Sequence, residues 1–305
     1  MKKVMLGPTI CLLAVLLLLP ACNNSGAATG KKSIVATYSI LGSIVEELVG
    51  DVASVSVSIP NGLDPHEWEP SARDIEKINR ADLIVQNGLG LEGGMEKALA
   101  QAQANGVKFF TASDYITVRH VGPGEGIPSG DPDQVIGAPD PHLWTDPLAM
   151  KNIVAALADY LNTTLNIDVT AKAQDLQARL DSLNTQVAAE VAALPPDSRK
   201  LVTGHESMGY FAQRYGFKLV GALIPSLSSQ ANVSAGDLAA LKQLILDNNV
   251  KVIFAEVGTS GAVASVIASE TGARVVELST HILPSDGSYF TFETELAATI
   301  VNALK

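Results

Sequence analysis

Four of the five histidines in this 305-residue chain recur at nearly even intervals, and three of them stand in contexts typical of metal sites. They are His66 in the run DPHEWEP, His142 in DPHLW, His205 in TGHE and His281 in STH. Neutral imidazole is the commonest protein ligand for zinc-like metals. A single histidine of this kind more often caps a turn or packs in a core, but four together favour a shared metal site.

The elements that would position these histidines follow from an alternation of β-rich and helical stretches that begins at Ser33. The first part of the pattern predicts strands over 33–37, 55–59, 83–86 and 107–110 and helices over 40–49, 72–79 and 92–104. Two helices follow, over 147–165 and 169–194. The last part predicts strands over 201–203, 218–220, 252–255 and 275–278 and helices over 207–215, 236–246, 262–270 and 290–304. The Gly- and Pro-rich stretch 121–141 predicts a surface loop.

Strands that alternate with helices indicate parallel βαβ units and therefore an α/β fold. We expect two Rossmann-like (βα)4-type lobes, over 33–165 and 196–305, joined by a long connecting helix over 166–195. Ligands of open α/β sheets bind beyond the carboxyl ends of the strands. His205 and His281 directly follow predicted strands, and His66 lies a few residues past one. Because each lobe supplies two histidines, we expect a metal site in the inter-lobe cleft.

The N-terminal residues carry a targeting signal. Lys2 and Lys3 precede an apolar run over 11–19 that is too short to span a membrane. The run ends in the sequence LPAC, which resembles a bacterial lipobox. We interpret residues 1–22 as a signal peptide cut before Cys22, Cys22 as the lipidation site and residues 23–32 as a flexible tether. An ordinary secretory signal cut nearby is the alternative. Cys11 and Cys22 are the only cysteines, so any metal must be held by nitrogen and oxygen.

Composition and motifs argue against other classes of protein. The net charge of −11 excludes nucleic acid as a partner, because binding phosphate backbones needs a basic surface. His205-Glu206 resembles the start of a zinc-protease helix, but Gly209 stands where a second histidine is required. No Gly-x-Ser-x-Gly nucleophile motif is present. We therefore expect no enzyme, although a zinc-dependent hydrolase stays as the minor alternative. A surface adhesin would need an exposed apolar patch, which the sequence cannot reveal.

The histidine motifs, together with the run LVTGHESMGYF over 201–211 and Tyr215-Gly216, resemble the solute-binding lipoproteins of bacterial ABC importers for zinc and manganese. The resemblance covers about residues 32–305. It implies an extracytoplasmic protein, anchored by lipid to the bacterial cell membrane in the periplasm or at the cell surface. Such a protein captures a divalent metal and delivers it to an importer permease and its ATPase. We also expect a monomer.

The resemblance also implies a ligand set. The first three ligand positions of the family fall on His66, His142 and His205. The third is histidine in most zinc carriers and glutamate in many manganese carriers, so His205 indicates Zn²⁺ rather than Mn²⁺. At the fourth position the family usually presents Asp after a small polar residue, whereas this chain has Thr280-His281. We take His281 as the fourth ligand, with Asp286, Glu256 or a water as alternatives.

Four imidazoles suit zinc, which accepts a tetrahedron of nitrogens, better than manganese, which prefers oxygen. Imidazole must be unprotonated to bind, so we expect affinity to fall as pH drops through about 6.5. The second ring nitrogens also need partners. Glu67, Glu206 and Asp146 are the nearby candidates, unless they are solvent-exposed or helix-start charges. Trp68 and Trp144 either shield the site or pack in the core, and His120 is predicted to be a plain surface residue.

Overall fold

The computed structural model describes residues 30–125 and 136–305, and Lys31–Lys305 form one compact unit. The predicted signal peptide, Cys22, most of the predicted tether and part of the 121–141 loop lie outside the described residues. Below, the N-terminal half means residues 31–165 and the C-terminal half means residues 196–305.

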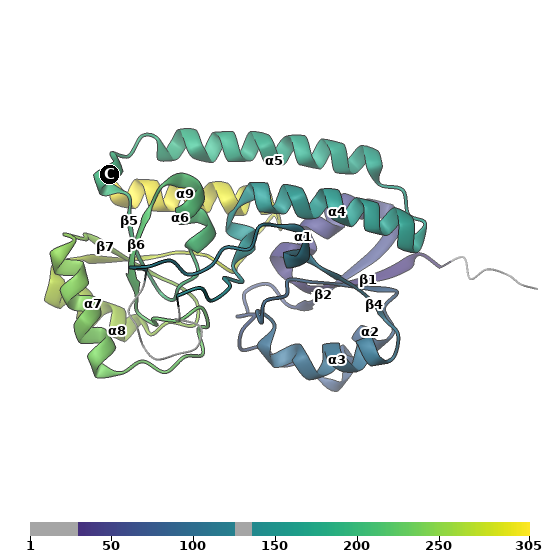
Figure 1. Cartoon of the computed structure of the whole chain (residues 1–305), viewed down its shortest axis with the longest axis horizontal. Coiled ribbons are helices and arrows are strands. Elements are labelled where there is room, and N and C mark those ends of the chain that lie inside the picture. Colours follow the sequence, from purple (N-terminus) through teal and green to yellow (C-terminus); the bar gives the residue numbers. More distant parts are fainter. Residues whose placement is uncertain (1–29, 126–135) are drawn as a thin grey trace, which may run out of the picture. The chain divides into compact units, whose positions relative to one another are not determined.

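The N-terminal half is built on a four-stranded parallel sheet in the order β2-β1-β3-β4. Its strands are β1 (Lys32–Tyr38), β2 (Ala53–Ile59), β3 (Leu83–Gln86) and β4 (Lys108–Thr111). Its helices are α1 (Ser39–Val49), α2 (Ala72–Asn79) and α3 (Glu96–Ala104). The chain leaves β1 in one direction to form β2 and then crosses back to β3 and β4. Right-handed crossovers therefore place α1 on one face of the sheet and α2 and α3 on the other (Figure 1).

The C-terminal half departs from the expected single sheet, because its described strands form two hydrogen-bonded parallel pairs, β5-β6 and β7-β8. The strands are β5 (Lys200–Thr203), β6 (Lys218–Ala222), β7 (Val252–Ala255) and β8 (Arg274–Glu277). β5 and β7 contact each other, so the two pairs lie side by side. The helices are α6 (Gly209–Tyr215), α7 (Ala235–Asp247), α8 (Gly261–Thr271) and α9 (Tyr289–Leu304). The parallel βα order therefore holds, while the ladder is interrupted between β5 and β7.

Two long helices lie between these sets of strands in the sequence. α4 spans Pro147–Leu165, and it begins where Asp146 accepts a hydrogen bond from the backbone N–H of Leu148 and Pro147 fixes the first turn. α5 spans Thr170–Val191. It contacts α4 and α1 of the N-terminal half and α9 of the C-terminal half, and Figure 1 shows α4 and α9 beneath opposite ends of α5, which therefore lies along both halves.

The apolar face of α5 explains this placement. Its buried side chains recur every three or four residues, so they form one stripe along the helix: Ala173, Leu176, Leu180, Leu183, Val187 and Val191. All six belong to the main hydrophobic core, which continues from the N-terminal sheet to α9. A smaller second core lies between the C-terminal strands and α7 and α8. Because the main core is shared, moving one half against the other would expose apolar surface at a cost of about 25 cal/mol per Å².

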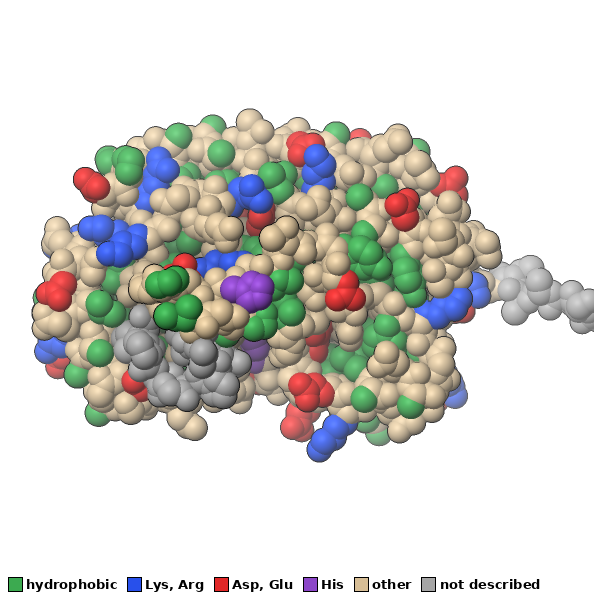
Figure 2. Space-filling view, viewed as in Figure 1, with side chains coloured by type: hydrophobic (Ala, Val, Ile, Leu, Met, Phe, Trp, Pro, Cys, Tyr) green, Lys and Arg blue, Asp and Glu red, His purple; other side chains and the backbone are tan. Residues whose placement is uncertain are grey.

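The surface bears on partners as well. Figure 2 shows basic and acidic side chains scattered over the same face rather than gathered by sign. This mixed pattern lacks the basic stripe that nucleic acid would require on that face. Within residues 30–125 and 136–305, no helix combines the length and apolarity needed to cross a bilayer.

Candidate metal centre

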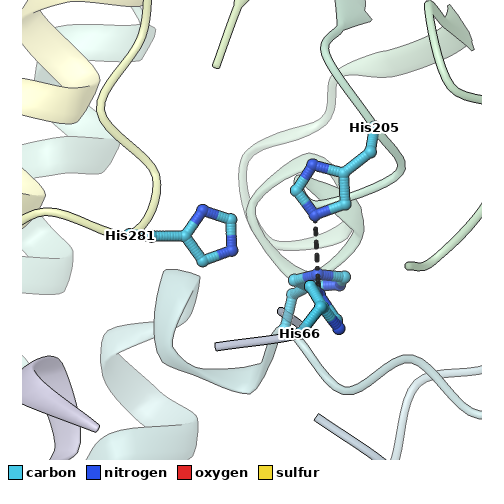
Figure 3. A group of neighbouring side chains, drawn as sticks. His66, His205 and His281 are labelled. Carbon is cyan, nitrogen blue, oxygen red and sulfur yellow. Dashed lines mark hydrogen bonds between the residues drawn. The ribbon is translucent and has the colours of Figure 1, made fainter. Parts of the chain in front are cut away.

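The four predicted histidines come together from four different loops. His66 follows β2, His142 immediately precedes a 3-10 helix over Leu143–Thr145, His205 follows β5 and His281 follows β8. All four side chains are buried, and each offers a nitrogen that lies within 4.8 Å of the other three. Figure 3 shows His66, His205 and His281 turned toward one another from separate segments. The sequence rule that ligands meet beyond the carboxyl ends of parallel strands thus places three of these residues.

The spacing of the ring nitrogens fits one small metal ion. His66 Nε2 lies 3.3 Å from His142 Nε2, which lies 3.1 Å from His205 Nε2. Zinc–nitrogen bonds of about 2.0–2.1 Å at tetrahedral angles require nitrogens about 3.3 Å apart. His281 Nε2 is buried and has no hydrogen-bond partner among the described residues. A buried nitrogen without a partner is costly unless a ligand takes up its lone pair.

His142 is oriented by Asp140. Asp140 Oδ1 accepts hydrogen bonds from the backbone N–H of His142 and from its Nδ1, both at 2.9 Å. A carboxylate only accepts, so Nδ1 carries the hydrogen and Nε2 presents its lone pair to the other imidazoles. Burial raises the pKa of Asp140 to about 6, and the Arg119 guanidinium 3.0 Å away opposes that rise.

Glu256 lies beside both histidines of the C-terminal half, and its contact with His205 Nδ1 is a short charge contact rather than an aligned hydrogen bond. Its Oε2 lies 3.0 Å from His205 Nδ1 and accepts hydrogen bonds from Ser207 Oγ at 2.8 Å and Thr280 Oγ1 at 3.0 Å. Its Oε1 accepts from the backbone N–H of Gly204 at 3.0 Å. Thr280 Oγ1 in turn lies 2.9 Å from Nδ1 of His281. Glu256 lies in the loop after β7, and its buried carboxylate therefore links the loop after β5 to the loop after β8.

Trp144 closes the site from the core side. It is fully buried, and its ring lies 5.3 Å from the rings of both His142 and His281, centroid to centroid. Its indole N–H donates to the carbonyl of Thr280 at 2.8 Å. Trp144 thus packs in the core and touches two imidazoles at once. Trp68 is only partly buried and packs against the main core.

Burial keeps most of the imidazoles neutral. Burial, and after it the positive charge of His205, lower the pKa of His66 to about 3 and the pKa of His281 to about 4. The same two causes hold the pKa of His142 well below its ordinary value. For His205, burial lowers the pKa but the negative charge of Glu256, helped by other acids, raises it by more. The expected loss of affinity near pH 6.5 therefore depends on His205 rather than on all four rings.

The acids nearest in sequence were the wrong partners. Glu67 is exposed, and Asp146 caps α4 and pairs with Arg214, which agrees with the helix-start alternative. Glu206 is buried, but its Oε1 has no hydrogen-bond partner in the described chain, and burial raises its pKa to about 8. The imidazole partners are instead Asp140, Glu256 and Thr280. Asp140 was recognisable, because in both Asp-Pro-His runs the aspartate accepts from the backbone N–H two residues on.

Two further residues lie away from the centre. Asp286, an alternative fourth ligand, is exposed and bonds the backbone N–H of Ser288 and the Thr291 hydroxyl at the start of α9. His120 is exposed, as predicted, and its Nδ1 contacts the carbonyl of Val118. Neither belongs to the group of four imidazoles.

A glycine-rich turn after β3 was overlooked at the sequence level. Residues 88–93 read GLGLEG, the spacing of a phosphate-binding loop between a strand and a helix. Glu92 occupies this turn itself: its carboxylate accepts from the backbone N–H groups of Asn87 at 2.6 Å and Gly88 at 3.4 Å and from Thr37 Oγ1 at 2.7 Å. The carboxyl group of Glu92 therefore occupies the backbone N–H groups that a phosphate would need.

One cavity in the described chain is separate from the imidazoles. It measures about 650 Å³ and lies on the far side of the loop that carries His281, lined by Leu278, Ile282 and Phe292 among others. None of the four histidines lines it, whereas Glu256 forms part of its wall. The four imidazoles themselves are buried, with at most 8% of a residue exposed.

Comparison with known proteins agrees with this geometry. The family described as zinc-uptake complex component A, periplasmic (ZnuA) matches residues 34–303. The chain is 33% identical over 288 residues to the high-affinity zinc uptake system protein ZnuA of Bacillus subtilis, which covers 88% of this chain and 86% of that protein. It is 31% identical to the zinc-binding lipoprotein AdcA of Streptococcus pneumoniae over 90% of this chain, but spans only 54% of AdcA.

Other relatives differ in the metal they are named for. The manganese-binding lipoprotein MntA of Halalkalibacterium halodurans is 25% identical over 94% of this chain and 93% of that protein. Among solved structures, the periplasmic zinc binding protein TroA from Treponema pallidum superposes with a TM-score of 0.78 at 25% identity, covering 90% of this chain and 99% of TroA. These are metal-uptake proteins rather than enzymes, which sets aside the hydrolase alternative. The chain therefore belongs to the ZnuA family of periplasmic zinc-uptake components.

Proposed function

We propose that this protein captures Zn²⁺ outside the cytoplasm with His66, His142, His205 and His281 and delivers it to the permease and ATPase of an ABC importer. The observation that carries the proposal is the group of four buried imidazoles with nitrogen spacings of 3.1 and 3.3 Å. Four protein ligands complete a zinc tetrahedron and leave no open position for chemistry. The metal is therefore cargo.

The ligand types favour zinc over manganese. Manganese prefers oxygen ligands and forms weaker complexes with nitrogen than zinc does. Two carboxylates beside the imidazoles, Asp140 and Glu256, are already engaged by hydrogen bonds from the rings or their neighbours. A manganese carrier of the same family is the second candidate, because the relative MntA is named for that metal.

The cellular setting is proposed from the sequence. Lipidation at Cys22 and the tether over 23–32 would hold the domain near the outer surface of the bacterial cell membrane, beside the permease. We further propose two lobes, 33–165 and 196–305, which contribute two ligands each and are joined by the connecting segment 166–195. We expect the protein to work as a monomer.

Capture requires the site to open. The imidazoles are buried, so we propose that the loops carrying them separate to admit the metal and close around it. α5 packs against helices of both halves, and the main core is continuous between them. Opening should therefore involve the loops more than a hinge rotation of the halves.

A competition titration tests the proposal. Metal-stripped wild-type protein (residues 23–305), His281→Ala and Asp286→Ala are titrated with Zn²⁺ and with Mn²⁺ against a chromophoric chelator. We expect tight one-to-one zinc binding and weak manganese binding in the wild type, weaker zinc binding in His281→Ala, and wild-type behaviour in Asp286→Ala. Tighter binding of manganese than zinc would overturn the metal assignment, and unchanged zinc binding in His281→Ala would overturn the fourth ligand.

A further inference from the structure

Arg119 lies outside the group of imidazoles, in the segment after β4, yet its guanidinium is buried, with only 6% of the side chain exposed. It donates to Asp140 Oδ2 at 3.0 Å and to Glu125 Oε2. A buried cation is costly unless it is paired, and the planar fork of arginine suits two carboxylates at once. Glu125 Oε2 also accepts from the backbone N–H of Gly122, which closes the turn at the start of the loop ahead of His142.

Asp140 joins this pair to the metal site. Its two oxygens are divided between two tasks: Oδ2 accepts from Arg119, and Oδ1 accepts from the backbone and the ring of His142. If Arg119 were removed, Oδ2 would lose the one hydrogen-bond donor described for it. The carboxylate could then rotate, and the His142 ring would lose the fixed acceptor that points Nε2 at the other imidazoles.

The other side of the pair is the start of α6. The backbone N–H of Arg119 donates to Tyr210 Oη at 2.9 Å. Gly209 approaches so closely that a Cβ there would lie 2.1 Å from Asp140 Oδ2 and 2.4 Å from Arg119 Nη1. Only glycine fits, so the absence of a side chain at position 209 is what admits the ion pair. Because α6 follows His205, the pair is held between the His142 loop and the segment that carries His205.

We propose that Arg119 is a positioning residue of the metal site, which holds His142 in its ligating orientation through Asp140. The inference rests on the proposed function, because it assumes that His142 binds the metal. Removing a partner that orients a ligating histidine typically weakens metal binding about 10–100-fold. We expect Arg119→Met to lose zinc affinity in that range.

Arg214 supplies a matched control. Its guanidinium pairs with both oxygens of one aspartate, at 2.9 and 2.6 Å from Asp146 Oδ1 and Oδ2, and Arg214 lies on α6, next to the Arg119 pair. Asp146, however, caps α4 and contacts no imidazole among its described hydrogen bonds. Arg214→Met therefore removes the same charge and an arginine–aspartate pair without disturbing a partner of the imidazoles.

The experiment measures zinc affinity by chelator competition and the visible spectrum of the Co²⁺-loaded protein, which reports the number and type of ligands. We expect Arg119→Met to bind zinc about 10–100-fold more weakly with an altered Co²⁺ spectrum. Arg119→Lys, which retains the charge but not the fork, should bind more tightly than Arg119→Met. Arg214→Met should stay within about threefold of wild type with an unchanged spectrum, because neither Arg214 nor Asp146 has a described hydrogen bond to an imidazole.

Each result decides the question. Wild-type affinity and spectrum in Arg119→Met would overturn the proposal, and so would equal losses in Arg119→Met and Arg214→Met, which would indicate general destabilisation. Thermal unfolding of the metal-free variants checks that they fold. If Arg119→Met does not fold, Arg119→Lys decides, since the proposal then requires weaker zinc binding with an altered spectrum. Absence of tight zinc binding in the wild type would refute the proposed function instead, which is a distinct outcome.

Discussion

Replacing Glu256 by Gln should disable the site while leaving its shape almost unchanged. Every described partner of this carboxylate donates to it: the Gly204 N–H to Oε1, and the Ser207 and Thr280 hydroxyls to Oε2, which also faces His205 Nδ1. An amide offers only one acceptor oxygen. If its NH₂ faces Gly204, two donors meet. If its NH₂ faces His205, Nδ1 must accept, so the ring hydrogen moves to Nε2 and that ring cannot bind metal.

The size of the effect follows from the number of ligands involved. Loss of one orienting partner of a ligating histidine costs about 10–100-fold in affinity, which corresponds to about 1.4–2.7 kcal/mol. Glu256 acts on His205 directly and on His281 through Thr280, so we expect a loss near the upper end of that range. The metal-free variant should also unfold more easily, because a buried donor left without an acceptor costs about 1–3 kcal/mol.

The assay compares zinc affinity by chelator competition in wild type, Glu256→Gln and Glu277→Gln. Glu277 is an exposed acid at the end of β8, on the same segment that leads to His281, so its replacement removes the same charge without disturbing the imidazoles. Only Glu256→Gln should lose affinity. Zinc binding within threefold of wild type in Glu256→Gln would refute the reasoning, because the orientation of two ligands could not then depend on that carboxylate.

Three further predictions concern pH, stability and motion. As pH falls below the raised pKa of His205, zinc affinity should fall by up to about tenfold per pH unit, because that ring must lose one proton to bind, while the pKa values of His66 and His281 lie at about 3 and 4; calorimetric titrations that show three or four protons released per zinc would contradict this. Glu293→Met should raise the free energy of unfolding by about 1–3 kcal/mol, because neither carboxyl oxygen has a described hydrogen-bond partner. Burial holds the pKa of Glu293 well above its ordinary value, so as pH rises this carboxyl ionises in the unfolded chain before it does in the folded protein. The stability gained by Glu293→Met should therefore grow as pH rises above about 4.5. An unchanged or lower thermal midpoint of Glu293→Met at neutral pH would count against the prediction. X-ray scattering profiles of metal-free and zinc-loaded protein should coincide, because α5 packs against both halves, whereas marked compaction on loading would reveal a hinge.

Local signals in the sequence predicted the elements well. The bounds of α4, β3 and β7 match the expected ranges, and for α4 the reason is visible in Asp146 and Pro147, which start the helix in the way the sequence indicates. α5 was placed within a few residues by its apolar periodicity. The split of the C-terminal strands into two pairs was not predicted, because strand pairing joins segments far apart in the chain and short strands carry no register signal.

The sequence predicted the four histidines that meet at the centre but not the partners of their rings. The four histidines share a position after strands or before a helix, which is a local feature. Glu67, next to His66 in sequence, is exposed, whereas Glu256 reaches His205 from 51 positions away. That contact exists because β5 and β7 lie side by side, so the loops that follow them meet. Knowing the strand order would have identified Glu256 as a partner rather than as an alternative ligand.

Zinc K-edge X-ray absorption of the zinc-loaded protein tests the central claim most directly, because it counts the atoms bound to the metal. A single shell of four nitrogens at about 2.0–2.1 Å, with the outer scattering of four imidazole rings, is the predicted result. In His281→Ala one ring should disappear from that pattern. A wild-type spectrum with carboxylate oxygen in the first shell, or with three rings or fewer, would contradict the four-histidine site.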